Sequence, residues 1–198
     1  MTNPYDQPIA RRFVEWVFSF VLAAGVVALW VGLYKFNAIF FESIGVSQYI
    51  SWIFLPAAIR MISVMLLDWL GAAGLFVGAL ITSQPFLNQS LSEAIVLAGL
   101  SALGPVIAVT FCSRWLRMPS NFSGLGLRQL TLFGLTGALC NVIPHNIYFY
   151  MTDRIPSPLA GVFPMFVGDL LGTVIVLWFC ALVLKSVFPK RSKLNEPV

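Results

Sequence analysis

The chain has 198 residues, of which 59% are hydrophobic and only 10% are charged. Soluble domains carry about 25% charged residues, so this composition excludes a soluble domain and indicates an integral membrane protein with little mass outside the bilayer. The net charge of +4 comes from basic residues dispersed around predicted helix ends, which excludes a nucleic-acid-binding face.

The apolar runs divide the chain into one membrane domain and two short polar ends. Residues 1–12 contain two prolines and end in two arginines, and we expect a polar cytoplasmic lead there. Residues 13–188 hold every long apolar run, which predicts a single integral membrane helical domain. Residues 189–198 are polar and basic, and we expect a cytoplasmic tail.

The first half of the domain predicts three helices. The run Phe13–Tyr34 is long enough to span, and the aromatic and polar segment Phe36–Ile50 is expected to lie along the outer interface. The apolar stretch Ser51–Gln84 has 34 residues, too long for one crossing of ~20 residues, and Asp68 and Gly71 interrupt it. We therefore predict a hairpin of two short helices, over Ser51–Leu67 and Leu70–Ser83.

The second half predicts three further helices. Ser90 and Glu93 have the spacing of a capping box, which predicts that a helix opens there. Met118–Gly126 contains proline and glycine and predicts a loop. The helices are expected over Leu91–Leu116, Leu127–Tyr150 and Ala160–Val187, which gives an all-α, polytopic membrane bundle of about six transmembrane helices.

Basic residues predict the orientation of this bundle. Only Lys35 and Arg154 fall on one predicted side, whereas nine basic residues fall on the other, and the positive-inside rule then places both termini in the cytoplasm. The nine are Arg11, Arg12, Arg114, Arg117, Arg128, Lys185, Lys190, Arg191 and Lys193.

Two opposite charges lie inside the apolar helices. Arg60 and Asp169 are each nine residues from the predicted outer end of their helix, so they share a depth of ~13 Å. Each charge costs ~2.5–3.5 kcal/mol near the centre of a membrane helix, and an ion pair in the bundle interior is the arrangement of lowest cost. Such a pair either only pins two helices together or also contacts a ligand or ion.

Three polar residues on the fifth predicted helix extend this cluster. Asn141 is expected at the level of the pair, with His145 and Asn146 about one turn nearer the outside. The histidine is either an ordinary hydrogen-bonded residue or a pH-sensing or ligand-contacting one. The asparagines are either interhelical hydrogen-bonding residues or part of a ligand-binding cluster.

Small residues four apart predict places where helices approach closely. Gly74 and Gly78 form one such pair, Gly168 and Gly172 flank Asp169, and a third pair is Ala24 and Ala28. The sequence contains no pattern for a catalytic set, for a metal site or for a cofactor, and we expect a protein that is not an enzyme.

Two segments resemble the first of the bacterial membrane-associated sensor domain families. Trp52 and Pro56, followed by the glycine-rich run that contains Gly74 and Gly78, are similar to that family's tryptophan–proline helix and the helix after it. Gly168-Asp169-Leu-Leu-Gly172 resembles its late Gly-Asp-x-x-Gly helix. The resemblance implies a multi-pass sensory module in the bacterial inner membrane, usually fused to a signalling output domain. The family typically has about eight helices, and Arg60 is not part of its motif.

Three functions follow as expectations. The first is a sensor-like module that binds a small ligand or senses membrane state and passes the signal to a separate partner protein. The second is a substrate-binding membrane component of a vitamin-type uptake transporter, in which Ala24 and Ala28 would dock a coupling protein. The third is a structural subunit of a membrane complex without a ligand.

Overall fold

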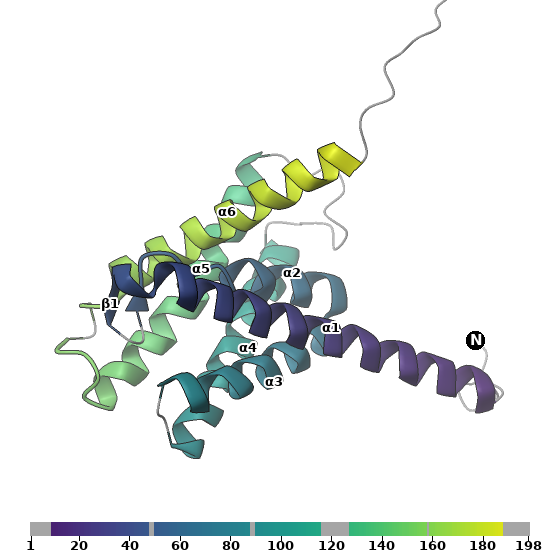
Figure 1. Ribbon diagram of the computed structural model, residues 1–198, viewed down its shortest axis with the longest axis horizontal. Coiled ribbons are helices and arrows are strands. Elements are labelled where there is room, and N and C mark those ends of the chain that lie inside the picture. Colours follow the sequence, from purple (N-terminus) through teal and green to yellow (C-terminus); the bar gives the residue numbers. More distant parts are fainter. Residues whose placement is uncertain (1–8, 48–49, 88–89, 116–126, 158, 188–198) are drawn as a thin grey trace, which may run out of the picture.

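The computed structural model describes residues 9–47, 50–87, 90–115, 127–157 and 159–187. Within them the fold is helical, with six α-helices, one 3₁₀-helix and one small antiparallel hairpin (Figure 1). The expected all-α class is therefore confirmed for the described part of the chain. The predicted loop Met118–Gly126 and the predicted tail lie outside the described residues, as does most of the predicted lead.

Helix α1 (Ile9–Phe41) is longer at both ends than predicted. It begins four residues before Phe13, and Arg11 pairs with Glu15 one turn later, at 3.4 Å from Nε to Oε1. The segment Phe36–Ile50, which is predicted to lie along the outer interface, begins within α1, because the helix continues to Phe41; its place in a membrane stays a prediction. Asn37 does not break it, since the Asn37 side chain turns inward and is only 7% exposed.

The chain between α1 and α2 is largely non-helical. A 3₁₀-helix (Glu42–Ile44) leads into β1 (Gly45–Ser47), which pairs antiparallel with β2 (Ile50–Ser51), and α2 (Ala57–Leu67) starts only after Pro56. The helix predicted over Ser51–Leu67 is therefore wrong in its first six residues.

The backbone of this non-helical segment is hydrogen-bonded to distant helices. Phe54 N–H donates to Gly168 O at 3.0 Å, and Leu55 N–H donates to Asn37 Oδ1 at 2.9 Å. These partners replace the bonds that a longer α2 would form, as buried backbone groups require.

Helices α2 and α3 (Trp69–Leu87) meet in the predicted hairpin. The corner residue Asp68 is exposed and has φ 51°, the left-handed region that allows a sharp change of direction. Gly71 is required next to it, because a Cβ there would overlap the backbone oxygen of Ser63. Helix α3 continues past the predicted end at Ser83 and has 19 residues.

Helices α4 (Leu91–Trp115), α5 (Leu127–Met151) and α6 (Val162–Val187) lie close to their predicted ranges. The capping box at the start of α4 is confirmed. Ser90 N–H donates to Glu93 Oε2 at 3.1 Å, and Glu93 N–H donates to Ser90 Oγ at 3.3 Å.

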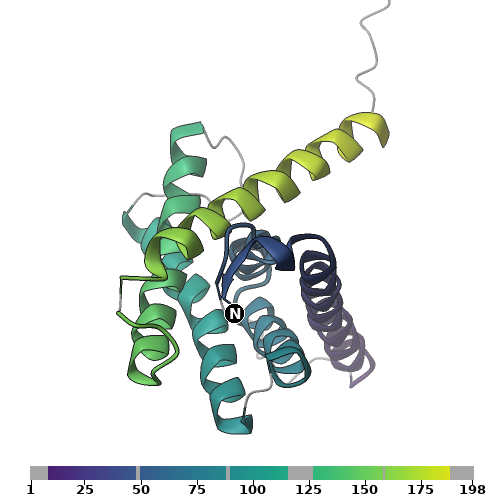
Figure 2. The ribbon, with the colours of Figure 1, turned by 60° about the vertical axis from the view of Figure 1, so that its left-hand side comes forward.

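The helices pack as a bundle with α2 near its middle. Helix α3 packs against α1 and α4, α4 packs against α5, and α2 contacts α3, α4 and α6. Figure 2 shows α6 crossing over the other helices. The N-terminal half of α1 and the C-terminal half of α6 project from the bundle (Figure 1) and expose large apolar side chains such as Trp16 (73%) and Trp178 (65%).

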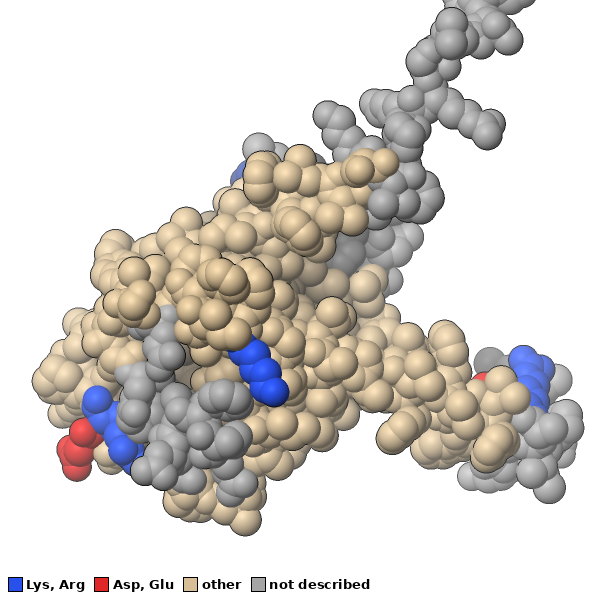
Figure 3. All heavy atoms as spheres, in the orientation of Figure 1, with Lys and Arg blue, Asp and Glu red and all other residues tan. Residues whose placement is uncertain are grey.

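Three of the described helices are long and apolar enough to cross a membrane. They are Phe13–Phe41 within α1, Leu91–Trp115 and Val162–Cys180 within α6. Ala57–Leu67 and Trp69–Ser83 are shorter apolar helices, so six crossings stay a prediction. Few charged side chains interrupt the surface between the two ends of the molecule in Figure 3.

Candidate functional site

The centre of the candidate site is a buried ion pair between Arg60 and Asp169. Arg60 Nη1 lies 3.1 Å from Asp169 Oδ2, and the two residues are 5% and 3% exposed. The predicted pair is therefore present, although the argument from equal helix depth rested on wrong helix starts. Arg60 is the fourth residue of α2 rather than nine residues along it, and Asp169 is the eighth residue of α6.

Aromatic rings and a tight backbone contact fix the position of the pair. The guanidinium carbon of Arg60 lies 5.4 Å from the centre of the Trp30 ring and 4.9 Å from that of Phe54, which is cation–π geometry. Gly168 and Gly172, on either side of Asp169, lie against the backbone oxygens of Ser51 and Phe54. The predicted close approach at these glycines is confirmed, but its partner is the non-helical segment rather than a helix.

Asn141 and His145 of α5 join the pair in one hydrogen-bonded row. Asn141 Nδ2 donates to Asp169 Oδ2 at 2.7 Å, so the carboxylate oxygen accepts from both Arg60 and Asn141. His145 Nδ1 lies 2.8 Å from Asn141 O, and it must carry the hydrogen because a carbonyl only accepts. In the neutral ring Nε2 is then an acceptor, 3.4 Å from Ser101 Oγ.

The remaining predicted residues lie apart from this row. Asn146 Nδ2 donates to Val142 O and to Met165 Sδ, and the residue contacts neither Arg60 nor Asp169. Trp52 packs edge-on against Phe163 and is 37% exposed, whereas Pro56 is buried at the start of α2. The prediction of a tryptophan–proline helix is wrong, because both residues precede α2.

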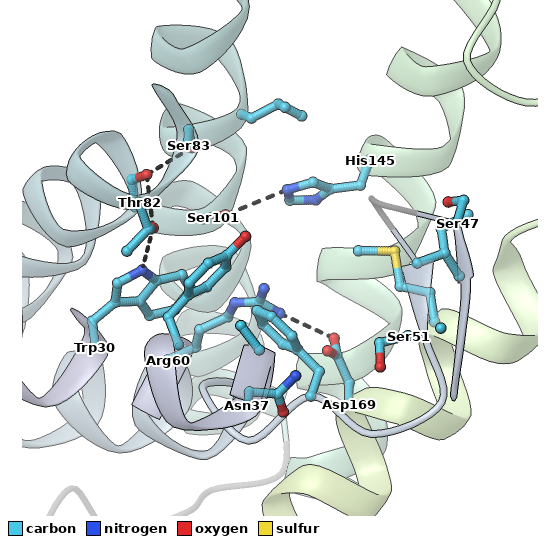
Figure 4. A pocket seen from close by; sticks show the side chains of 18 of the residues that line it. Trp30, Asn37, Ser47, Ser51, Arg60, Thr82, Ser83, Ser101, His145 and Asp169 are labelled. Carbon is cyan, nitrogen blue, oxygen red and sulfur yellow. Dashed lines mark hydrogen bonds and ion pairs between the residues drawn. The ribbon is translucent and has the colours of Figure 1, made fainter. Parts of the chain in front are cut away.

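The ion pair borders a cavity of about 200 Å³, which we name the polar cavity. It lies between the β1–β2 hairpin and the six α-helices of the described residues. In Figure 4 the Arg60 and Asp169 side chains point toward one another, His145 points toward Ser101, and Trp30 points toward Thr82. The walls combine aromatic rings, hydroxyl groups and one ion pair of zero net charge. The polar cavity is lined in part by Trp30, Tyr34, Asn37, Phe54, Thr82, Ser83, Ser101, His145 and Phe149.

Sequence reasoning missed three residues that shape the polar cavity. Trp30 Nε1 donates to Thr82 Oγ1 at 3.1 Å, joining α1 to α3, and Asn37 holds the backbone at Leu55. Thr82 and Asn37 are polar residues within otherwise apolar helices, and this pattern could have indicated them from the sequence. Trp30 gives no such signal, because tryptophan is ordinary in a membrane helix.

Four buried side-chain atoms of the described residues have no hydrogen-bond partner. Three of these atoms belong to the row around the ion pair: Arg60 Nε, Asp169 Oδ1 and Asn141 Oδ1. The fourth is Asn146 Oδ1, which faces Gly161. Buried polar atoms are normally paired, so one unused donor and two unused acceptors in one row can bind a polar guest or buried water.

No metal cluster forms within the described residues, where no three His, Cys, Asp or Glu side chains gather. No family model, curated protein or solved structure matches the chain. The resemblance to the sensor family and the function of the site therefore stay predictions.

Proposed function

We propose that this chain is an integral membrane protein that binds a small polar ligand in the polar cavity and passes the signal to a separate partner. The observation that carries the proposal is the buried Arg60–Asp169–Asn141 row, which retains unpaired atoms and of which Arg60 and Asp169 border the cavity. Such a row is costly in a membrane interior, and ionisable residues there generally serve a function.

The charges of the row indicate the kind of ligand. Because Arg60 and Asp169 neutralise each other, a ligand with a net charge would leave one unbalanced charge in a region of low dielectric constant. A net-neutral or zwitterionic molecule that both donates and accepts hydrogen bonds meets no such penalty. Such a ligand would accept a hydrogen bond from Arg60 Nε and donate one to Asp169 Oδ1.

The membrane orientation in this proposal follows the count of basic residues. Both termini lie in the cytoplasm after six crossings of a bacterial inner membrane, so the polar cavity opens in the outer half. The three apolar helices support membrane insertion, and α2, α3 and α5 are proposed as the remaining crossings.

A substrate-binding component of a small-solute transporter is the second candidate. The observation in its favour is the non-helical chain ahead of α2, which lies beside the cavity. Transporters commonly place their substrate where irregular backbone next to a helix borders the site. Ala24 and Ala28 are exposed on α1, as docking to a coupling protein would require.

Native mass spectrometry of the protein in mild detergent tests ligand binding. We expect a small-molecule adduct on the wild type and none on the Arg60→Met, Asp169→Leu double variant, which removes both charges without stranding either. The control is Glu93→Gln with Arg154→Gln, which removes the ion pair between α4 and the segment after α5, at 2.7 Å and away from the polar cavity. A folded double variant that keeps the adduct would contradict the proposed site.

A further inference from the structure

A second cavity lies behind the ion pair. It has a volume of about 390 Å³, within the ~300–1,000 Å³ of typical ligand pockets, and we name it the apolar crevice. It lies between α2, α4, α5 and α6, and Arg60 and Asp169 line it as well as the polar cavity. Its other lining residues include Met61, Leu66, Pro105, Gly134, Thr173 and Leu177.

The lining of the apolar crevice suits hydrocarbon rather than water. Apart from the mutually neutralised ion pair, Thr173 is the one polar side chain among the described residues of its wall, and its hydroxyl already donates to Asp169 O at 2.7 Å. A water molecule needs two to four polar partners, whereas an apolar cavity stays dry and takes up apolar molecules.

The apolar crevice opens on the outer surface of the bundle. Leu66 and Leu177 belong to its wall and are 58% and 46% exposed, so the crevice is continuous with the apolar surface of α2 and α6. In the proposed membrane orientation that surface meets lipid. Acyl chains are therefore the apolar molecules present at its mouth.

The size of the space excludes a partner helix of several turns seated inside it. A helix is ~10 Å across, so about one turn of it would already fill the volume. The wall of the crevice leaves room at Gly134, where a Cβ would meet only Leu170 Cδ2, at 3.9 Å. The geometry points to a thin, flexible and neutral occupant: we propose that the apolar crevice binds the acyl chain of a membrane lipid.

This second site goes beyond the proposed ligand site but shares its central residues. An acyl chain in the crevice covers the side of Arg60 and Asp169 that faces away from the polar cavity. Water is thereby excluded from that side, and the electrostatic attraction within the pair is stronger where the local dielectric constant is low.

Photo-crosslinking tests the site directly. The protein is reconstituted into bilayers of phosphatidylcholine that carries a diazirine in one acyl chain, and labelled residues are mapped by mass spectrometry. We expect labelling of Met61 and of the α5 segment around Gly134. Gly134→Leu adds a large side chain to the wall of the crevice and should reduce that labelling at least fivefold, while labelling of exposed Ile107 stays constant.

Two further variants control this experiment. Gly99→Leu makes the same change on α4, where a Cβ would meet nothing within 4 Å. Gly99 is outside the wall of either cavity, so this variant should leave the labelling intact. Gly134→Ala is the milder change if leucine prevents folding, and it should reduce the labelling about twofold. Labelling of Met61 and α5 that equals the wild type in folded Gly134 variants would overturn the proposal.

The proposed lipid site and the proposed small-ligand site can be contradicted independently of each other. A small-molecule adduct without crevice labelling would overturn only the lipid site, whereas crevice labelling without an adduct would overturn only the proposed function.

Discussion

The two glycine pairs of this protein share a spacing but contact different kinds of structure. Gly74 and Gly78 of α3 face α1, where added Cβ atoms would lie 2.8 Å from Val26 Cβ and 3.0 Å from Trp30 Cβ. At Gly168 and Gly172 of α6, added Cβ atoms would overlap backbone oxygens of the non-helical segment before α2. The spacing thus predicts close approach in both places, but it does not tell whether a helix or an extended chain approaches.

The difference lies in how far the neighbouring chain must move. Added Cβ atoms at Gly74 and Gly78 would lie 2.8–3.0 Å from atoms of α1, among them the backbone oxygen of Ala23 at 3.0 Å, so the two helices need to separate by only a few tenths of an ångström to admit a methyl group. A backbone oxygen beside Gly172 cannot shift without moving Phe54, the start of α2 and Arg60 with it. Variants at these glycines therefore measure how rigidly the site is held.

The largest effect is expected for Gly172→Ala. Overpacking typically costs ~1–3 kcal/mol, and we expect about 3 kcal/mol here because the added methyl overlaps backbone. Unfolding by titration with a harsh detergent from a mild one measures the change in free energy. A Gly172→Ala protein as stable as the wild type would show that the segment before α2 is not packed rigidly on α6.

A smaller loss is expected for Asn37→Ala. This change removes the acceptor of Leu55 N–H, and an unsatisfied buried donor costs ~1–3 kcal/mol, so we expect about 2 kcal/mol in the same titration. The control is Lys35→Ala, an exposed position on the same helix, which should stay within ~0.5 kcal/mol of the wild type. Equal effects of the two variants would mean that Asn37 does not hold the segment.

Gly74→Ala is expected to cost about 1 kcal/mol, the lower end of overpacking, because α1 needs to move away by only a few tenths of an ångström. The measurement is again the detergent titration, with native mass spectrometry to confirm that any adduct in the polar cavity is retained. A loss as large as that of Gly172→Ala would remove the distinction between the two glycine pairs.

The smallest effect is expected for Gly99→Ala, and it has the opposite sign. Nothing lies within 4 Å of an added Cβ there, so the variant should gain ~0.5–1 kcal/mol from the lower flexibility of its unfolded chain. A loss of stability at this position would show that α4 contacts something beyond the described residues.

The sequence predicts the helices and the ion pair because both follow from the free-energy cost of unpaired polar groups in a membrane. Apolar runs must form helices in a membrane, and the only two opposite charges deep within them, Arg60 and Asp169, must meet. The position of Asn141 on its helix predicts that it lies level with the ion pair, and its hydrogen bond to Asp169 agrees with this.

The non-helical start of α2 could not be predicted in the same way. Residues Ser51–Pro56 continue the apolar pattern of α2, and proline is ordinary at a helix start. The deciding partners are Gly168 O and Asn37 Oδ1, which lie far away in sequence. Asn146 was grouped with the site for its position on α5, yet the helix directs it toward Met165 instead.

The tight corner at Asp68 and Gly71 gives α2 a mechanical role. The helix is 11 residues long. The segment before it packs closely against α6, and at the corner after it the helix packs closely against α3. A shift of α6 would therefore displace α2, and the close contact at Gly71 leaves α2 little room to move independently of α3. The ion pair and the corner between α2 and α3 would then move together, so the geometry of the polar cavity depends on how α6 packs on the segment before α2.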